Sequence, residues 1–490
     1  MNKLLKWQLV SFVSRGIAMI FGIVQSVIIA RILTVSEFGL VGIVAGIGSI
    51  FGVYQHLGLA SGSTREISAA KDKKEIYKIF ITSVLIRYTV TFPLAAGLFF
   101  MARYLAVEKY SNPELITPLK LYALVLLAQG FQSLFNSLIS GTQRFKHLFV
   151  YQAAIALISV IIYVPLTLIY KINGYFASLL IFNLVSSVIL AALALFPLRG
   201  SFALPNRSDL KRLLKEILSI SLGIYLVKIL FTIWQKSGPV LLGLSVTAEQ
   251  VGIFSFALLY AGKLMGISDA VTDVSLPLLS KEYSVNFENF KNLFSNNFDK
   301  ILAFTILASF SAIYWSREVF HFALNGQKYD ASLVYVPPLI FAFVFYSLVN
   351  IIKSGIIIPT KMVKEMVISY TVLLLTTVIF YFSFSRSIGS IVSMVYGMVT
   401  GSFLAFVIMV LLTSRKLKYN FFNLNHLAIV LMGVLFSFAD YLGSIQIKSM
   451  IYVFYLLVYT AFLFFARFVT KSHIMRLVSL ASSIFKYEKE

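Results

Sequence analysis

The chain contains no cysteine, few acidic residues and few histidines. With no cysteine among its 490 residues, it cannot form disulfide bonds or thiolate metal sites. The histidines are scattered singly and form no metal-ligand pattern: His56, His147, His321, His426 and His473. No phosphate-binding GxxxxGKS/T motif occurs, and no connection is long enough for a nucleotide-binding domain, which excludes ATP hydrolysis by this chain.

Hydrophobic residues are abundant instead. They make up 59% of the chain, and the mean hydropathy is +0.87, whereas the apolar share of a soluble protein is near one half. A transmembrane helix needs about 20 apolar residues. Runs of this length lie near residues 11–33, 38–57, 79–102, 115–140, 148–170, 174–197, 217–238, 250–279, 301–323, 331–357, 362–384, 388–412, 426–445 and 449–468. The sequence therefore predicts an all-α integral membrane protein with about 14 transmembrane helices.

Basic residues alternate between the two sides of the predicted membrane. Connections on one side carry 26 of the 42 Lys and Arg residues, connections on the other side carry 10, and six lie inside predicted spans. By the positive-inside rule, the richer side, which includes both termini, is cytoplasmic. Membrane topology thus accounts for the net charge of +22, so we expect a phospholipid bilayer as partner and no nucleic acid.

Two stretches of the chain repeat after about 210 residues. FQSLFNSLISG at Phe131–Gly141 and FYSLVNIIKSG at Phe345–Gly355 share six of eleven residues. A polar stripe with the spacing 4, 3, 4, 3 occurs on the first predicted helix and again on the seventh; its members are Ser11, Arg15, Ala18, Gly22 and Gln25, then Ser221, Tyr225, Lys228, Thr232 and Gln235. We therefore predict a six-helix N-lobe (1–200), a pseudo-symmetric six-helix C-lobe (201–413), and a segment (414–490) holding helices 13 and 14 and a cytoplasmic tail.

The turns after the first and seventh predicted helices carry capping-box patterns. Thr34 precedes Glu37, and Thr247 precedes Gln250, with the three-residue spacing that lets each side chain satisfy backbone donors at a helix start. Glu37 and Gln250 are therefore interpreted as caps rather than as catalytic residues. The second predicted helix carries GxxxG spacings at Gly42, Gly46, Gly48 and Gly52, which predict close packing between helices.

Cations inside predicted spans are the candidates for substrate binding. A charged side chain deep in the membrane is costly, so an intramembrane Arg or Lys indicates a functional site. Lys228 and Lys263 lie near the middle of their spans; Arg15 and Arg87 lie nearer the ends, and Arg15 has the alternative of snorkelling to the cytoplasmic surface. Neutral polar residues expected to line the same cavity are Gln25, Tyr225, Thr232 and Gln235.

Acidic residues are nearly absent from the predicted spans. Only Asp269 and Asp273 lie well inside one, and the first lobe has none. Such a cavity favours an anion, because cationic donors can replace its lost hydration. The two aspartates are candidates for carrying a coupling proton or Na⁺; alternatively, one of them forms a structural salt bridge with Lys263. No other cofactor and no metal site is expected.

Two segments resemble a known family. ARILTVSEFGLVGI at Ala30–Ile43 is similar to the amino-terminal signature of the oligosaccharide flippases, the Wzx-type O-antigen and polysaccharide transporters of the MOP superfamily. VGIFSFALLY at Val251–Tyr260, the repeated lobes and the basic cytoplasmic loops extend the resemblance over the chain.

The resemblance implies alternating access by two lobes in a MATE-like inverted V. An undecaprenyl-pyrophosphate-linked oligosaccharide repeat unit would move from the cytoplasmic to the outer leaflet of a bacterial inner membrane, with its head group near Arg15, Lys228 and Lys263. The product would feed O-antigen, capsule or exopolysaccharide synthesis, with a polysaccharide polymerase complex as a further partner. Helices 13 and 14 resemble the pair that forms a groove for the lipid tail in lipid II flippases.

Three other functions remain open at this stage. A multidrug extruder of the same fold is the nearest alternative, but export of cations typically needs an acid in the first lobe. A membrane glycosyltransferase, polymerase or ligase would be expected to carry catalytic residues in a sizeable external loop, and the predicted outer connections are short. A scaffold for a polysaccharide assembly complex would need no intramembrane cations. We therefore expect a transporter and not an enzyme.

Overall fold

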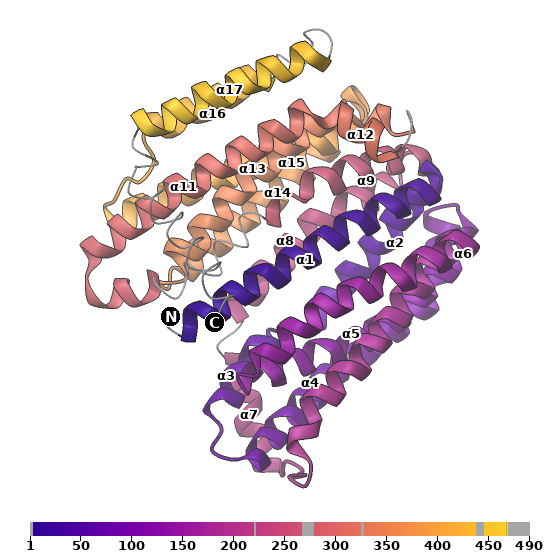
Figure 1. Cartoon of the computed structure of the whole chain (residues 1–490). Helices are drawn as coiled ribbons and strands as arrows, with labels where there is room; N and C mark the ends of the chain where they lie inside the picture. The colour runs from indigo at the N-terminus through magenta and orange to yellow at the C-terminus, as the bar shows by residue number, and fades with distance from the viewer. Residues whose placement is uncertain are drawn as a thin grey trace, which may run out of the picture. The chain divides into compact units, whose positions relative to one another are not determined.

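The computed structural model describes residues 3–219, 222–266, 279–324, 328–437, 445–466 and 468; this part of the chain is helical and contains no strand (Figure 1). It forms two compact units. Unit 1 comprises Met1–Leu259, Phe320–Tyr335 and Tyr370–Met398, and unit 2 comprises Tyr260–Val319, Val336–Ser369 and Val399–Glu490. The predicted lobes at 1–200 and 201–413 were defined by the sequence repeat and not by compactness, and this division stays a prediction.

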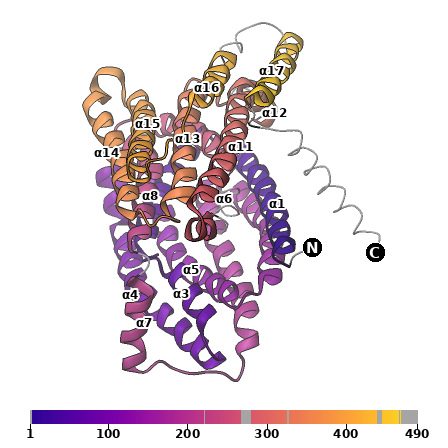
Figure 2. The ribbon, with the colours of Figure 1, turned by 90° about the vertical axis from the view of Figure 1, so that its left-hand side faces the viewer.

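Unit 1 contains most of the helices. They are α1 (Lys3–Ile32), α2 (Val35–Tyr54), α3 (Leu59–Ala69), α4 (Lys73–Tyr104), α5 (Ile116–Gly141), α6 (Phe145–Leu195), α7 (Arg207–Ser219), α8 (Leu222–Leu242), most of α9 (Ala248–Gly262), and parts of α12 (Ser316–Leu324), α14 (Val363–Ile388) and α15 (Ser390–Leu417). Figure 2 shows α3 and α7 at the end of the unit where α4 begins, and both α3 and α4 contact α7.

Helix α6 is a hairpin of two antiparallel helices. Lys171 has a φ of 52° and a ψ of −129°, which breaks the helix in the middle. Beyond the break the chain folds back, since the Ser178 hydroxyl lies 3.3 Å from the carbonyl oxygen of Ile162, to which it donates a hydrogen bond. The two predicted helices at 148–170 and 174–197 are therefore both present.

The predicted membrane spans correspond to helices of the structure. Among the described residues, eight helices are long and apolar enough to cross a membrane, with the α6 hairpin counted as one, or nine when the bent pair of α11 (Phe287–Tyr314) and α12 is taken as one span. Each predicted hydrophobic run overlaps a described helix in chain order, although parts of the runs at 217–238, 250–279, 426–445 and 449–468 lie outside the described residues. The all-α membrane fold is confirmed, whereas the count of fourteen spans stays a prediction.

The predicted helix caps are confirmed. At the start of α2, the amide of Glu37 donates to the Thr34 hydroxyl at 3.1 Å, and the amide of Thr34 donates to the Glu37 carboxylate at 2.7 Å. At the start of α9, the corresponding distances between Thr247 and Gln250 are 3.3 and 3.2 Å. Each pair satisfies backbone donors that a helix start leaves free.

The glycines of α2 allow close helix packing, as predicted. A Cβ atom at Gly46 would lie 2.6 Å from a methyl carbon of Val240, and one at Gly48 would lie 2.2 Å from the ring of Tyr122. Any larger residue would therefore push α2 away from α8 and α5.

Unit 2 contains the rest of these helices together with α11, α13 (Val336–Ile352), α16 (Leu424–Ser437) and α17 (Ile445–Phe465). Helix α17 packs on α11, since the hydroxyl of Tyr459 donates to the carbonyl of Ala303 at 2.7 Å. Lys448 of α17 forms a 2.6 Å ion pair with Glu318. The two predicted C-terminal helices are thus part of this unit, and α17 leaves an apolar face exposed that includes Phe454.

Candidate functional site

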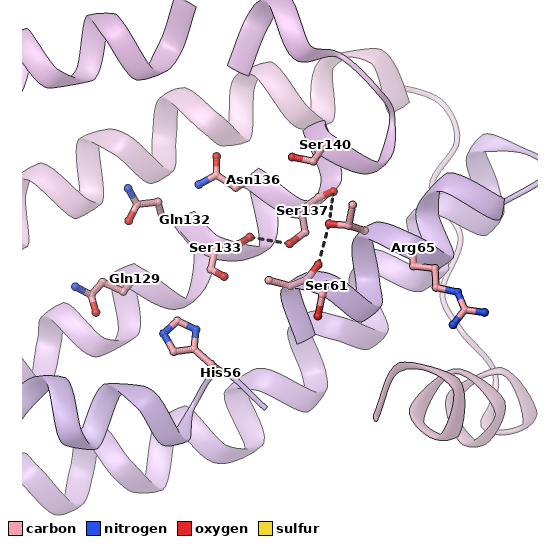
Figure 3. A pocket seen from close by; sticks show the side chains of 11 residues that line it. His56, Ser61, Arg65, Gln129, Gln132, Ser133, Asn136, Ser137 and Ser140 are labelled. Atoms are coloured by element: carbon pink, nitrogen blue, oxygen red, sulfur yellow. Dashed lines mark hydrogen bonds between the residues drawn. The ribbon is translucent and has the colours of Figure 1, made fainter. Parts of the chain in front are cut away.

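A polar cavity lies in unit 1 between α3 and the second half of α5 (Figure 3). Its volume is about 910 Å³. The polar side chains that line it are His56, which follows α2; Ser61, Thr64 and Arg65 of α3; and Gln129, Gln132, Ser133, Asn136, Ser137 and Ser140 of α5. No Asp or Glu is among the described residues that line the cavity, so this part of the wall presents donors and neutral acceptors.

The sequence of α5 explains why its polar residues face one way. They follow one another at steps of three and one residues, which places them on a single face of the helix. The opposite face carries Leu134 and Leu138, which are buried in an apolar cluster with Ile79 and Leu190. Burial of this apolar face fixes the rotation of α5 and turns the polar stripe toward the cavity.

Arg87 of α4 lies behind the cavity wall and is fully buried. Its guanidinium donates to the Ser133 hydroxyl at 3.3 Å and lies 3.4 Å from Nδ1 of His56. Its Nε atom has no hydrogen-bond partner, and within the described residues no carboxylate forms an ion pair with it. A buried cation without a counter-ion is unfavourable for folding. Features that cost stability in this way are typical of functional sites.

Lys228 of α8 adds a second cation to this region. It lies close enough to His56 and Arg87 for its charge to act on both, and it forms no hydrogen bond or ion pair with the described residues. One turn earlier on α8, the Tyr225 hydroxyl donates to the carbonyl of Tyr54 at 2.8 Å, which attaches α8 to the end of α2. The structure therefore brings together two predicted cations, Arg87 and Lys228, with the predicted polar residue Tyr225.

The other predicted site residues lie elsewhere. The amide oxygen of Gln25 accepts a hydrogen bond from Ser159 of α6 at 2.7 Å, so this residue joins two helices. Thr232 and Gln235 are half-buried on α8. Lys263 is half-buried in unit 2 just after α9.

Three predicted residues lie outside what the structure describes. Arg15 belongs to α1, but its side chain lies outside the described part, and Asp269 and Asp273 lie in the undescribed segment 267–278. The ion-coupling role and the salt bridge to Lys263 stay predictions.

Sequence analysis missed His56 and the polar stripe of α5. His56 was dismissed because it forms no metal-ligand pattern, and its position beside Arg87 depends on a contact 31 residues apart in the chain. The stripe was visible in the repeat FQSLFNSLISG, which contains Gln132, Ser133 and Asn136. The same three- and four-residue spacing that singled out the first predicted helix would have identified it.

Comparison with known proteins assigns the family. Residues 28–334, more than half of the chain, match the model of a family described as "Polysaccharide biosynthesis protein". The chain belongs to this family. No curated protein matches this member of the polysaccharide biosynthesis family.

Solved structures similar to this family member are transporters and a flippase. The lipid II flippase MurJ in an inward closed conformation has a TM-score of 0.70 at 15% identity, covering 93% of this chain and 98% of its own. An inward-facing multidrug resistance MATE transporter of the MOP superfamily has a TM-score of 0.66 at 15% identity, with coverage of 83% and 98%. A MOP superfamily transporter from Pyrococcus furiosus has a TM-score of 0.60 at 14% identity, with coverage of 84% and 95%.

These comparisons confirm the predicted resemblance to the MOP superfamily. The polysaccharide biosynthesis family member is a multi-pass membrane protein with the fold of MOP transporters. The three solved structures that share this fold are transporters or a flippase, and none is described as an enzyme.

Proposed function

We propose that the protein is a flippase for undecaprenyl-pyrophosphate-linked oligosaccharide repeat units, which it moves from the cytoplasmic to the outer leaflet of a bacterial inner membrane by alternating access. The product would serve O-antigen, capsule or exopolysaccharide synthesis. The observation that supports this function best is the pair of cations, Arg87 and Lys228, beside a polar cavity to whose wall the described part of the chain contributes no carboxylate.

A pyrophosphate fits this arrangement chemically. Its oxygens accept hydrogen bonds from a guanidinium and an ammonium, and charge-assisted bonds of this kind are roughly twice as strong as neutral ones. Arg87 has an unused Nε–H, and Lys228 has all three ammonium protons free of described partners. An anion bound here would also offset the electrostatic cost of burying Arg87. A cationic drug would meet charges of its own sign at Arg87 and Lys228 and would be repelled, which disfavours the multidrug alternative.

Four further predicted site residues and the orientation of the chain in the membrane belong to the same proposal. Arg15 and Lys263 would contact the head group along its path, and Asp269 and Asp273 would carry a coupling H⁺ or Na⁺. The excess of Lys and Arg on one side supports a cytoplasmic location for both termini. A polysaccharide polymerase complex would take up the product.

Flipping by the purified protein tests the proposal. The full chain is reconstituted into liposomes with a fluorescent undecaprenyl-pyrophosphate oligosaccharide, and the fraction of label that a membrane-impermeant quencher reaches is followed over time. Lys228→Ala is expected to slow flipping by roughly tenfold or more, because a hydrogen bond to a charged group contributes about 1.5–3 kcal/mol. Lys228→Arg should retain most of the rate.

Lys120→Ala is the matched control. Lys120 is an exposed lysine of the same unit whose ammonium lies over the ring of Phe99, away from the cavity residues, and its removal should leave the flipping rate unchanged. The proposal is wrong if wild-type protein does not move the pyrophosphate-linked lipid, or if Lys228→Ala flips as fast as Lys120→Ala. Faster transport of a cationic dye than of the lipid would favour the multidrug function.

A further inference from the structure

The polar stripe of α5 has hydrogen-bonding groups that the protein itself does not use. The side-chain amide of Gln129 forms no hydrogen bond with the described residues, and Oδ1 of Asn136 is buried without a partner. Both side chains line the cavity, and Figure 3 shows them on the same side of it as Gln132. A buried amide oxygen without a partner costs about 1–3 kcal/mol unless water or a ligand satisfies it.

Neighbouring residues hold this stripe in place. The Gln132 amide donates to the Ser186 hydroxyl of α6 at 2.7 Å, and the Ser137 hydroxyl donates to the carbonyl of Ser133 at 3.0 Å. Ser133 also accepts the hydrogen bond from Arg87. The stripe is therefore connected directly to the buried guanidinium of the anion site.

The chemistry of the cavity wall selects a class of ligand. Amides and hydroxyls offer donors and acceptors together, as the hydroxyl and acetamido groups of a sugar require. None of the lining residues that the structure describes is a carboxylate, Phe, Tyr or Trp. Arg65, the one cation of fixed charge in this described lining, extends away from the amides in Figure 3. The wall thus suits a neutral, polyhydroxylated group rather than an apolar or a charged one.

The volume fits this class of ligand as well. Sites for small molecules have volumes of about 300–1,000 Å³, and the cavity of about 910 Å³ is near the upper end of this range. Gln129 and Ser140 are eleven residues apart on α5, which corresponds to about 16 Å along the helix. A saccharide could lie along this stripe with its attachment point near Arg87.

We infer that the cavity between α3 and α5 is a saccharide subsite, in which Gln129 and Asn136 bind the neutral sugars next to the pyrophosphate. This inference rests on the proposed function, because Arg87 and Lys228 must hold the pyrophosphate beside the cavity. Specificity for the glycan then resides in α5, while the cations bind the part of the substrate that all such lipids share. A hydrogen-bonding site of this kind discriminates strongly against ligands that lack the matching groups.

Binding measurements with two lipid probes test the saccharide subsite separately from the proposed pyrophosphate site. The full chain in detergent is titrated with undecaprenyl pyrophosphate and with the same lipid carrying two N-acetylglucosamine residues. Wild-type protein is expected to bind both, and the glycosylated lipid more tightly. Asn136→Leu, which keeps the branched shape of the side chain but removes the amide, should weaken binding of the glycosylated lipid by roughly tenfold per lost hydrogen bond and leave binding of the bare lipid unchanged. Gln129→Leu should act in the same way.

Asn183→Leu is the matched control, because Asn183 is a buried amide of unit 1 whose one hydrogen bond within the described residues goes to the carbonyl of Leu179 in its own helix. It should alter neither affinity, and thermal unfolding checks that all variants fold. Equal wild-type affinity for the two lipids, or equal weakening of both by Asn136→Leu, would overturn the saccharide subsite while leaving the anion site intact. Absence of binding to either lipid would instead refute the proposed function and this inference with it.

Discussion

Replacing Arg87 by methionine is expected to stabilise the protein and abolish its transport at the same time. The guanidinium of Arg87 is fully buried, and within the described part of the chain it has no ionic partner. Only two long hydrogen bonds, at 3.3 and 3.4 Å, offset the loss of its hydration. Methionine has a similar length and needs no such compensation.

The expected change in the stability of Arg87→Met follows from these contacts. Burying a charged group costs several kcal/mol in proteins, and two hydrogen bonds of ordinary quality return about 1 kcal/mol each. Exchanging such a group for an apolar one of similar volume stabilises proteins by about 1–4 kcal/mol in known cases. We expect the unfolding temperature of Arg87→Met to rise by about 2–5 °C and its flipping rate in liposomes to fall at least tenfold.

Arg144→Met is the matched comparison, and its unfolding temperature is expected to change in the opposite direction. The Arg144 guanidinium donates to the carbonyl of Leu193 at 2.6 Å, near the end of α6, where a cation satisfies free carbonyls and interacts favourably with the helix dipole. Its loss should lower the unfolding temperature and leave transport intact. Thermal unfolding of the three proteins in one detergent, together with the flipping assay, decides the matter. If Arg87→Met lowers the unfolding temperature as much as Arg144→Met does, Arg87 is a structural residue and the reasoning fails.

Two further predictions concern the packing and the pH dependence of unit 1. In Gly252→Ala the new Cβ would lie 1.9 Å from the carbonyl oxygen of Val35, and we expect the unfolding temperature to fall by an amount that corresponds to about 1–3 kcal/mol of overpacking. Gly97→Ala is the control: its Cβ would meet nothing within 4 Å, and the unfolding temperature should not fall. The hydrogen bond from the Lys78 ammonium, 2.9 Å away, holds the pKa of Asp209 below its usual value. This carboxylate therefore stabilises the fold at neutral pH and loses its effect as the pH falls below about 4. Asp209→Asn should lower the unfolding temperature slightly at pH 7 and by progressively less as the pH falls below about 4; a decrease that stays the same at every pH would contradict the assignment.

Local features of the fold were predictable because they depend on residues close together in the chain. The caps at Thr34 and Thr247 follow from a three-residue spacing, and the break at Lys171 falls between two hydrophobic runs. Helix α7 was not predicted, because a short amphipathic helix is not a hydrophobic run. Its Leu213 is buried in the apolar cluster that also contains Leu134, so only the periodicity of its leucines could have indicated it.

The sequence by itself determined that this chain is an all-helical membrane protein, and it singled out cations of the first lobe and of α8 as unusual. It could not determine which of these cations meet. His56, Arg87 and Lys228 come from three separate parts of the chain, and they lie near one another because the apolar faces of α4 and α5 are buried together and α8 is attached to the end of α2 by Tyr225. The cavity likewise exists only because burial of one face of α5 turns its amides to the other side. Residue spacing along one helix fixes which side chains share a face, whereas packing between distant helices decides what that face meets.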